Sequence, residues 1–203
     1  MLILGLTGSI AMGKSTAATM FRRLSVRVFD ADRSVHEQLA TNEDAIATIA
    51  AAFPGVVRDG HVDRAALAQA VFADDAALDG LERLLHPLVD AAQEHFLRIA
   101  ARHRTPLVVL DIPLLFETGR ERDCDRVAVV SAPGFVQDQR LRARPGMDGQ
   151  RIEKTLARQM PDAEKRRRAD YIIPTGLNRG NTMRTIMGIV ADLRRHPAAS
   201  CRR

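Results

Sequence analysis

The chain has 203 residues, of which 46% are hydrophobic and 27% are charged, with a formal net charge of +5. This length suffices for one domain with a sizeable core, and the apolar content excludes an intrinsically disordered chain. No apolar run approaches the roughly 20 residues of a membrane span, and the N-terminal segment lacks the basic region and cleavage site of a signal peptide. Cys124 and Cys201 provide neither a disulfide framework nor metal-ligand spacing. We therefore expect a cytoplasmic protein with no membrane partner.

The positive charge is unevenly distributed along the chain. Residues 1–119 have a net charge of −4 and residues 120–203 a net charge of +9, and lysine occurs only at positions 14, 154 and 165. A basic region suits any polyanion, from phosphate esters to RNA. Because Trp is absent and there is one Tyr, aromatic platforms for stacking bases are scarce. Composition alone leaves the partner open.

Short apolar runs alternate with helical patterns along most of the chain. The apolar runs predict five strands, at residues 2–6, 26–29, 107–110, 126–130 and 171–173. Apolar residues at helical spacing predict helices at residues 15–24, 33–53, 64–72, 76–85, 87–103 and 182–195. Asp63, and either Asp74 or Asp75, are the expected N-caps of two of these helices. Continuous apolar strands separated by helices indicate an α/β fold with a parallel sheet.

Two regions interrupt this alternation. Residues 33–105 show no strand pattern, so we expect a helical insertion there. Residues 133–168 combine helical patterns with the breakers Pro145-Gly146 and Pro161, and they form the most basic part of the chain. We expect a helical flap there, in which residues 164–168 are a solvated helix face.

The segment Gly8-Ser-Ile-Ala-Met-Gly13-Lys14-Ser15 fits the pattern G-x-x-x-x-G-K-[ST]. Its glycines let successive N–H groups point at phosphate oxygens, Lys14 reaches the β- and γ-phosphates, and the Ser15 hydroxyl binds Mg²⁺. The helix that follows adds the positive end of its dipole. The expected strand precedes the loop, and one of only three lysines stands where the pattern requires it. The sequence therefore predicts a nucleoside triphosphate site.

Two carboxylates follow predicted strands, where an open α/β sheet binds its ligands. Asp32 has two interpretations: it orients an acceptor hydroxyl and takes its proton, or it caps the helix that begins at Arg33. Asp111 ends the strand at residues 107–110 and matches a Walker-B carboxylate that holds Mg²⁺, with a turn-forming Asp as the alternative.

Several residue groups together resemble the dephospho-CoA kinase family. They are Leu6-Thr7-Gly8 with the phosphate loop, Asp30-Ala-Asp32 with His36, Leu84-Leu-His86-Pro87-Leu-Val89, Asp111-Ile-Pro-Leu-Leu-Phe116-Glu117, Gln139-Arg140-Leu141 with Arg144, Gln159-Met160 with Lys165, and Ala169-Asp170-Tyr171-Ile-Ile173. The resemblance implies a P-loop kinase with a five-stranded parallel sheet flanked by helices. It further implies three parts: a nucleotide-binding core (1–32, 106–132 and 169–203), a helical acceptor-binding domain (33–105) and a basic helical lid (133–168).

The resemblance also implies the substrates and the site. ATP with Mg²⁺ would phosphorylate the ribose 3′-hydroxyl of dephospho-CoA, and Asp32 would be the base. Residues implied to bind the nucleotide are Gly8, Ser9, Ile10, Ala11, Met12, Gly13, Lys14, Ser15, Thr16, Arg140, Arg144 and Gly176. Residues implied to bind the acceptor are Asp32, His86, Pro113, Leu114, Phe116 and Glu117. The implied metal ligands are Ser15 and Asp111, and Lys14 and Arg140 join Asp32 as catalytic residues.

Some of these roles have structural alternatives. His86 is equally well explained as a residue before a helix-starting Pro87, and the apolar residues of 113–117 are expected to pack. Arg140 and Arg144 share a helix face and would neutralise charge on the triphosphate, as would Arg158. The family usually has Gly at the position of Ala11, so a positive φ there would strain the loop.

The function expected from the sequence is phosphorylation of dephospho-CoA by a monomer or weak homo-oligomer that binds no nucleic acid. Two alternatives stay open: another small-molecule P-loop kinase, acting on a nucleoside or nucleotide, and an RNA-binding P-loop protein that uses the basic C-terminal part.

Overall fold

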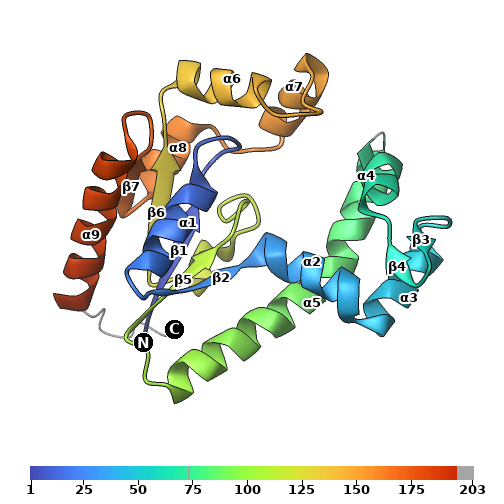
Figure 1. Cartoon of the computed structure of the whole chain (residues 1–203), viewed down its shortest axis with the longest axis horizontal. Coiled ribbons are helices and arrows are strands. Elements are labelled where there is room, and N and C mark those ends of the chain that lie inside the picture. The colour runs from blue at the N-terminus through green and yellow to red at the C-terminus, as the bar shows by residue number, and fades with distance from the viewer. Residues whose placement is uncertain (73, 196–203) are drawn as a thin grey trace. The chain divides into compact units, whose positions relative to one another are not determined.

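The computed structural model describes residues 1–72 and 74–195, so Cys201 lies outside the described residues. The chain divides into two compact units (Figure 1). Unit 1 comprises Met1–Phe29 and Ala100–Arg203, and unit 2 comprises Asp30–Ile99. No helix in the described part of the chain is both long enough and apolar enough to cross a membrane.

Unit 1 is built on a five-stranded sheet, as the sequence predicted. The strands are β1 (Leu2–Thr7), β2 (Arg27–Asp30), β5 (Leu107–Asp111), β6 (Arg126–Ser131) and β7 (Tyr171–Pro174), in the order β2-β5-β1-β6-β7. The central strand β1 runs parallel to both β5 and β6, and β6 runs parallel to β7. In this register Leu6 lies beside Asp111, so the segment that follows β1 and the carboxylate that ends β5 emerge at the same edge of the sheet.

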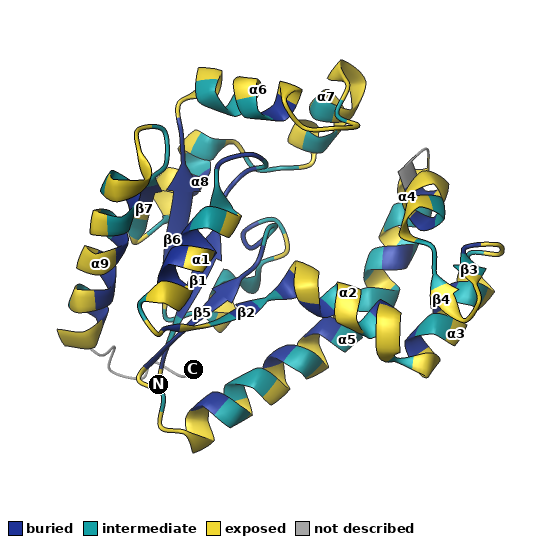
Figure 2. Ribbon diagram, viewed as in Figure 1, coloured by how far each residue is buried: buried dark blue, intermediate teal, exposed yellow. Residues whose placement is uncertain are grey.

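Helices cover this sheet and bury it. The helical elements of unit 1 are α1 (Lys14–Arg23), the 3₁₀ helix η1 (Arg120–Asp123), α6 (Gly134–Arg142), α7 (Gly149–Ala157), α8 (Asp162–Arg168) and α9 (Arg179–Arg195). Side chains of α1 and α9, among them Phe21 and Ile186, pack with those of β1, including Leu4, into one core. Figure 2 shows this core as the dark blue strands and the inward faces of the helices.

Unit 2 is mainly helical and has a core of its own. Its elements are α2 (Ala31–Thr41), α3 (Glu43–Ala52), β3 (Val57–Arg58), β4 (His61–Val62), α4 (Arg64–Phe72) and α5 (Asp75–Arg102), the last of which ends in unit 1. Leu39, Ile49, Leu67 and Leu81 are buried together in this core. The predicted cap Asp63 is confirmed, because its Oδ1 accepts the N–H groups of residues 65 and 66.

Three local expectations in unit 2 are wrong. The insertion contains a hairpin, β3–β4, whose two-residue turn places Asp59 and Gly60 at φ 50° and 77°. Positive φ at both turn residues matches the right-handed twist of a hairpin, which is why Asp-Gly favours it. The pattern at 33–53 forms two helices, since Asn42 caps α3 by accepting the N–H of Ala45. The two helices expected at residues 76–85 and 87–103 form one helix, α5, which continues through Pro87. The expected cap is confirmed at Asp74, whose Oδ1 accepts the N–H of Ala76.

Candidate active site

The segment after β1 folds as a phosphate-binding loop. Met12 N–H donates to Ser9 O at 3.1 Å, and Gly13 forms the N-cap of α1 with φ 92°. This left-handed conformation favours glycine. Gly8 is required for another reason: a Cβ there would lie 2.6 Å from the carbonyl oxygen of Val130 on β6. The two glycines of the motif therefore fix the path of the loop.

The carbonyl groups of the loop are bound by protein donors, whereas several of its N–H groups are available. In the part of the chain that the structure describes, the N–H groups of Ala11, Gly13, Lys14 and Ser15 donate to no protein acceptor. Gly13 O, by contrast, accepts the N–H groups of Thr16 and Ala17, in the first turn of α1. Successive free N–H groups at the start of a helix form a concavity suited to a phosphate.

Ala11 adopts the left-handed conformation, with φ 62°. A Cβ in this region clashes with the following carbonyl, which costs roughly 1–2 kcal/mol relative to glycine. The concern raised by the sequence is therefore realised: the conformation that this loop requires at position 11 is one in which alanine is strained.

Lys14 and Asp111 form a short ion pair. The distance from Lys14 Nζ to Asp111 Oδ1 is 2.6 Å, and the two side chains are 15% and 3% exposed. Lys14 begins α1, and Asp111 ends β5 next to the strand that leads into the loop. The parallel register brings the ammonium and the carboxylate together at the edge of the sheet where the free N–H groups also lie.

Ser15 and Asp111 supply the donors that a magnesium ion prefers. A hydroxyl and a carboxylate are hard oxygen ligands, and Mg²⁺ in kinases is bound by few protein ligands together with substrate phosphates. Ser15 is exposed in the first turn of α1, and its own N–H is one of the free groups. No cluster of three or more His, Cys, Asp or Glu suited to a metal occurs among the described residues. The donors present therefore fit a metal that arrives with the nucleotide.

Arg140, on α6, is bound to the loop and to Thr175. Its Nη2 donates to Thr175 O at 2.7 Å, and its Nη1 lies 3.3 Å from Ala11 O. The Thr175 hydroxyl in turn donates to Met12 O. Gly176, which follows, packs so closely on Pro133 that a Cβ would lie 2.3 Å from Pro133 Cδ.

Two glutamines that the sequence did not assign a role also contact the loop. Gln159 Oε1 accepts the N–H of Ile10, and Gln137 Nε2 donates to Ile10 O, both at 2.9 Å. Gln159 lies between α7 and α8, and Gln137 lies on α6. The only sequence signal was the Gln159-Met160 pair among the residues that resemble the family.

Glu117 anchors the segment that leads into α8. Its Oε1 accepts the N–H of Met160 at 2.8 Å and lies 2.8 Å from Lys165 Nζ. Lys165 is fully buried, so the expectation that residues 164–168 form a solvated helix face is wrong at this position. A buried ammonium requires a carboxylate partner, and Glu117 supplies it from 48 residues earlier in the sequence.

The other members of the segment at 113–117 are held in place in unit 1. Leu115 and Phe116 are buried, and the Arg168 guanidinium lies 4.6 Å from the centroid of the Phe116 ring. Leu114 is half-buried, and Pro113 O accepts the Thr7 hydroxyl at 2.9 Å. The expected packing role of the apolar residues is confirmed for Leu115 and Phe116.

Asp32 lies on unit 2 and is not a helix cap. The N-cap of α2 is Asp30, whose Oδ1 accepts the N–H of Arg33 at 3.0 Å, so the capping interpretation of Asp32 is wrong. Asp32 lies in the first turn of α2, where its side chain is exposed and has no hydrogen bond or ion pair within the described residues. His86 is exposed in the middle of α5. Pro87 lies inside that helix, so the interpretation of His86 as the residue before a helix-starting proline is wrong.

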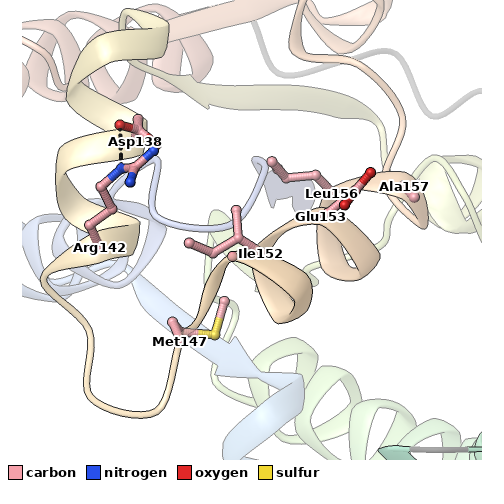
Figure 3. A pocket seen from close by; sticks show the side chains of 8 residues that line it. Asp138, Arg142, Met147, Ile152, Glu153, Leu156 and Ala157 are labelled. Atoms are coloured by element: carbon pink, nitrogen blue, oxygen red, sulfur yellow. Dashed lines mark hydrogen bonds and ion pairs between the residues drawn. The ribbon is translucent and has the colours of Figure 1, made fainter.

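The expected lid contains three helices and a hollow. Figure 3 shows Met147, Ile152 and Leu156 together with Asp138 and Arg142 of α6. These residues line a hollow of about 770 Å³. Asp138 and Arg142 are joined by an ion pair of 2.8 Å. The hollow includes no residue of the phosphate loop, and Arg144 and Arg158 are exposed.

Comparison with known proteins identifies the family. A family model described as dephospho-CoA kinase matches residues 2–181. The dephospho-CoA kinase of Paramagnetospirillum magneticum is 63% identical over 82% of this chain and 78% of its own length, and that of Rhizobium meliloti is 49% identical over 96% and 99%. The structure of the dephospho-CoA kinase from Campylobacter jejuni superposes with a TM-score of 0.71 at 24% identity, covering 97% of this chain and 98% of that one. The chain, with its phosphate loop and five-stranded sheet, belongs to the dephospho-CoA kinase family.

Proposed function

We propose that this protein transfers the γ-phosphoryl group of ATP to the ribose 3′-hydroxyl of dephospho-CoA, which yields CoA and ADP in the last step of coenzyme A biosynthesis. The observation that carries the proposal is the loop of free N–H groups next to the Lys14–Asp111 pair, in a chain of this family. In the transfer, the bond from the γ-phosphorus to the bridging oxygen breaks and ADP leaves. A new bond forms to the 3′ oxygen, whose proton passes to a carboxylate.

The phosphate loop binds and orients the triphosphate. The N–H groups of Ala11, Gly13, Lys14 and Ser15 donate to phosphate oxygens, and the positive end of the α1 dipole favours their charge. The Lys14 ammonium exchanges Asp111 for the β- and γ-phosphates. Ser15 and Asp111 would hold Mg²⁺, which would supply positive charge next to the phosphate oxygens when bound.

Asp32 is the base that accepts the proton of the 3′-hydroxyl. Its carboxylate is exposed and has no partner among the described residues, while the cap that begins its helix is made by Asp30. The carboxylate is therefore available to receive a hydrogen bond from the acceptor hydroxyl. General base catalysis of this kind contributes typically 10²–10⁴-fold.

The remaining roles divide the chain into three parts. Residues 33–105, with His86, bind dephospho-CoA, and Pro113, Leu114, Phe116 and Glu117 of unit 1 are further acceptor-binding residues. Residues 133–168 form a lid that excludes water from the transfer. Arg140 and Arg144 stabilise charge on the phosphates, and Gly176 lies beside the adenine. The enzyme acts in the cytoplasm as a monomer or weak homo-oligomer and binds no nucleic acid.

The direct test is to supply ATP, Mg²⁺ and dephospho-CoA and measure ADP and CoA. We expect stoichiometric formation of both, and no transfer to a panel of nucleosides and nucleotides. ADP release no faster than without acceptor contradicts the proposal, and transfer to a nucleoside assigns the chain to another small-molecule kinase.

Variants assign the two main residues. Lys14→Met should lower both ATP affinity and kcat. Asp32→Asn should lower kcat by about 10²–10⁴-fold and leave the ATP dissociation constant unchanged. Asp30→Ser, which keeps a capping oxygen at the N-terminus of α2, is the matched control and should retain turnover. Full turnover in Asp32→Asn contradicts the role of Asp32 as the base.

A further inference from the structure

The peptide groups on both sides of Ile10 are held by side chains from outside the phosphate loop. Gln159 Oε1 accepts the Ile10 N–H, and Gln137 Nε2 donates to Ile10 O, each at 2.9 Å. Gln137 lies on α6 and Gln159 follows α7, so the two amides come from segments 22 residues apart in sequence. Both amides contact the loop at Ile10, the residue before Ala11.

The hydrogen bond from Gln137 to Ile10 O determines the orientation of the Ala11 N–H. The Ile10 carbonyl and the Ala11 N–H belong to one planar peptide group and point in opposite directions. Gln137 binds this carbonyl, so the N–H on the other edge of the peptide faces away from Gln137. That N–H is one of the four that donate to no protein acceptor within the described residues. Gln159 fixes the preceding peptide group and so opposes a compensating rotation.

The strain at Ala11 favours rotation of the peptide group between Ile10 and Ala11. Its φ of 62° is strained for alanine. Rotation of the peptide between Ile10 and Ala11 changes φ of Ala11 and relieves the strain. The same rotation would turn the Ile10 carbonyl toward the phosphates and the N–H away from them. A hydrogen bond that must be broken for the rotation therefore protects the phosphate-binding shape.

We propose that Gln137 and Gln159 are positioning residues that hold the phosphate loop in its anion-binding conformation against the strain at Ala11. The inference rests on the ATP site of the proposed function and adds two residues to it. Neither glutamine contacts the reacting atoms. Each acts through the backbone of Ile10, and each joins the phosphate loop to one end of residues 133–168.

Removal of either amide should weaken ATP binding. We expect Gln137→Met and Gln159→Met to raise the ATP dissociation constant roughly three- to tenfold, the range for loss of one hydrogen bond. The dissociation constant is measured by titration calorimetry with Mg²⁺ present. In the Ala11→Gly background the rise should be clearly smaller, because glycine removes the strain. Gln150→Met, on an exposed position of α7, is the matched control and should leave binding unchanged.

A pair of charged variants tests the same idea through hydrogen-bond polarity. Gln159 acts as an acceptor and Gln137 as a donor. Gln159→Glu retains an acceptor, whereas Gln137→Glu removes the donor, and both add one negative charge next to the same residue. We expect Gln137→Glu to bind ATP at least threefold more weakly than Gln159→Glu.

The outcomes separate the two proposals. Equal ATP binding by the two Glu variants, or an undiminished Met effect in the Ala11→Gly background, overturns the positioning role. If a Met variant does not fold, the Glu pair decides. Failure of the unaltered chain to bind ATP refutes the proposed function instead.

Discussion

Lys14 and Asp111 lie with Nζ and Oδ1 2.6 Å apart, so the cation proposed for the phosphates is already paired with the carboxylate proposed for the metal. The pair is almost completely buried at the Asp111 end, where the side chain is 3% exposed. A triphosphate that enters without a metal must therefore compete with Asp111 for the ammonium. A triphosphate that brings Mg²⁺ supplies a new partner to each member of the pair.

Asp111→Asn should strengthen ATP binding in the absence of metal and lower turnover in the presence of Mg²⁺. In EDTA, the ATP dissociation constant should fall several-fold, because Lys14 no longer has an anionic partner. With Mg²⁺, turnover should fall by about 10²-fold or more, since the metal loses a charged ligand. Calorimetry and the ADP assay measure the two effects. Asp123→Asn, which removes the same charge from an exposed carboxylate paired with Arg120, is the control. Unchanged binding of metal-free ATP in Asp111→Asn contradicts the competition.

Ala11→Gly should stabilise the protein, because glycine adopts the observed φ of 62° without strain. We expect the free energy of unfolding to rise by about 1 kcal/mol and the melting temperature by roughly 2–4 °C. The control is Ala191→Gly on an exposed position of α9, which should lower stability by about 1 kcal/mol. A shift of the same sign in both variants argues against strain at position 11.

The buried pair of Lys165 and Glu117 should be costly to break from one side. Lys165→Met leaves Glu117 with no cationic partner, although its Oε1 still accepts the Met160 N–H. We expect a loss of roughly 3–5 kcal/mol in the free energy of unfolding by urea. The double variant Glu117→Gln with Lys165→Met should recover at least half of this loss, because no charge stays buried. Arg142→Met, which breaks an exposed pair, should have little effect. A double variant no better than Lys165→Met contradicts the explanation.

Cys124 should be unreactive in the folded protein. Burial, with help from Asp123 and Asp125, raises the pKa of its thiol from 9.0 to about 12. At pH 8.5 the thiolate fraction is then roughly a thousandth of that in the unfolded chain. Alkylation by iodoacetamide, followed by mass spectrometry of the Cys124 peptide, should be slower by at least two orders of magnitude than in urea.

The same pKa shift has a consequence for stability. Because the folded state binds the thiol proton more tightly, the contribution of Cys124 to stability is complete below about pH 9 and is lost as the pH rises toward 12.

For the alkylation test, a rate in the native state within tenfold of the rate in urea would show that the thiol is not buried and that its pKa is not raised.

Features that depend on neighbouring residues were predictable from the sequence. The five strands, the phosphate loop and the cap at Asp63 follow from apolar runs and local spacing. The hairpin was missed because its strands have two residues each, too few for an alternating pattern, although Asp59-Gly60 is a turn signal. Asp32 was the cap candidate because the helix was expected to begin at Arg33, but α2 begins at Ala31 and its cap is Asp30.

Contacts between distant parts of the chain were not predictable. Ile10 is separated by 127 residues from Gln137 and by 149 from Gln159, and no local pattern indicates such contacts. The burial of Lys165 depends on Glu117 in the same way. A run of four basic residues at 165–168 is typical of a solvated surface, and one carboxylate partner, Glu117, is enough to overturn that prediction at Lys165.

The chain's three lysines make amine chemistry selective in this protein. Lys165 is fully buried and Lys14 is 15% exposed and paired, so Lys154 is the exposed lysine of the three. An acylating reagent applied to the folded protein would thus modify Lys154 and the N-terminal amine first. The rate of acylation at Lys14, compared with and without triphosphate, would then report whether its ammonium is held by a carboxylate or by a triphosphate.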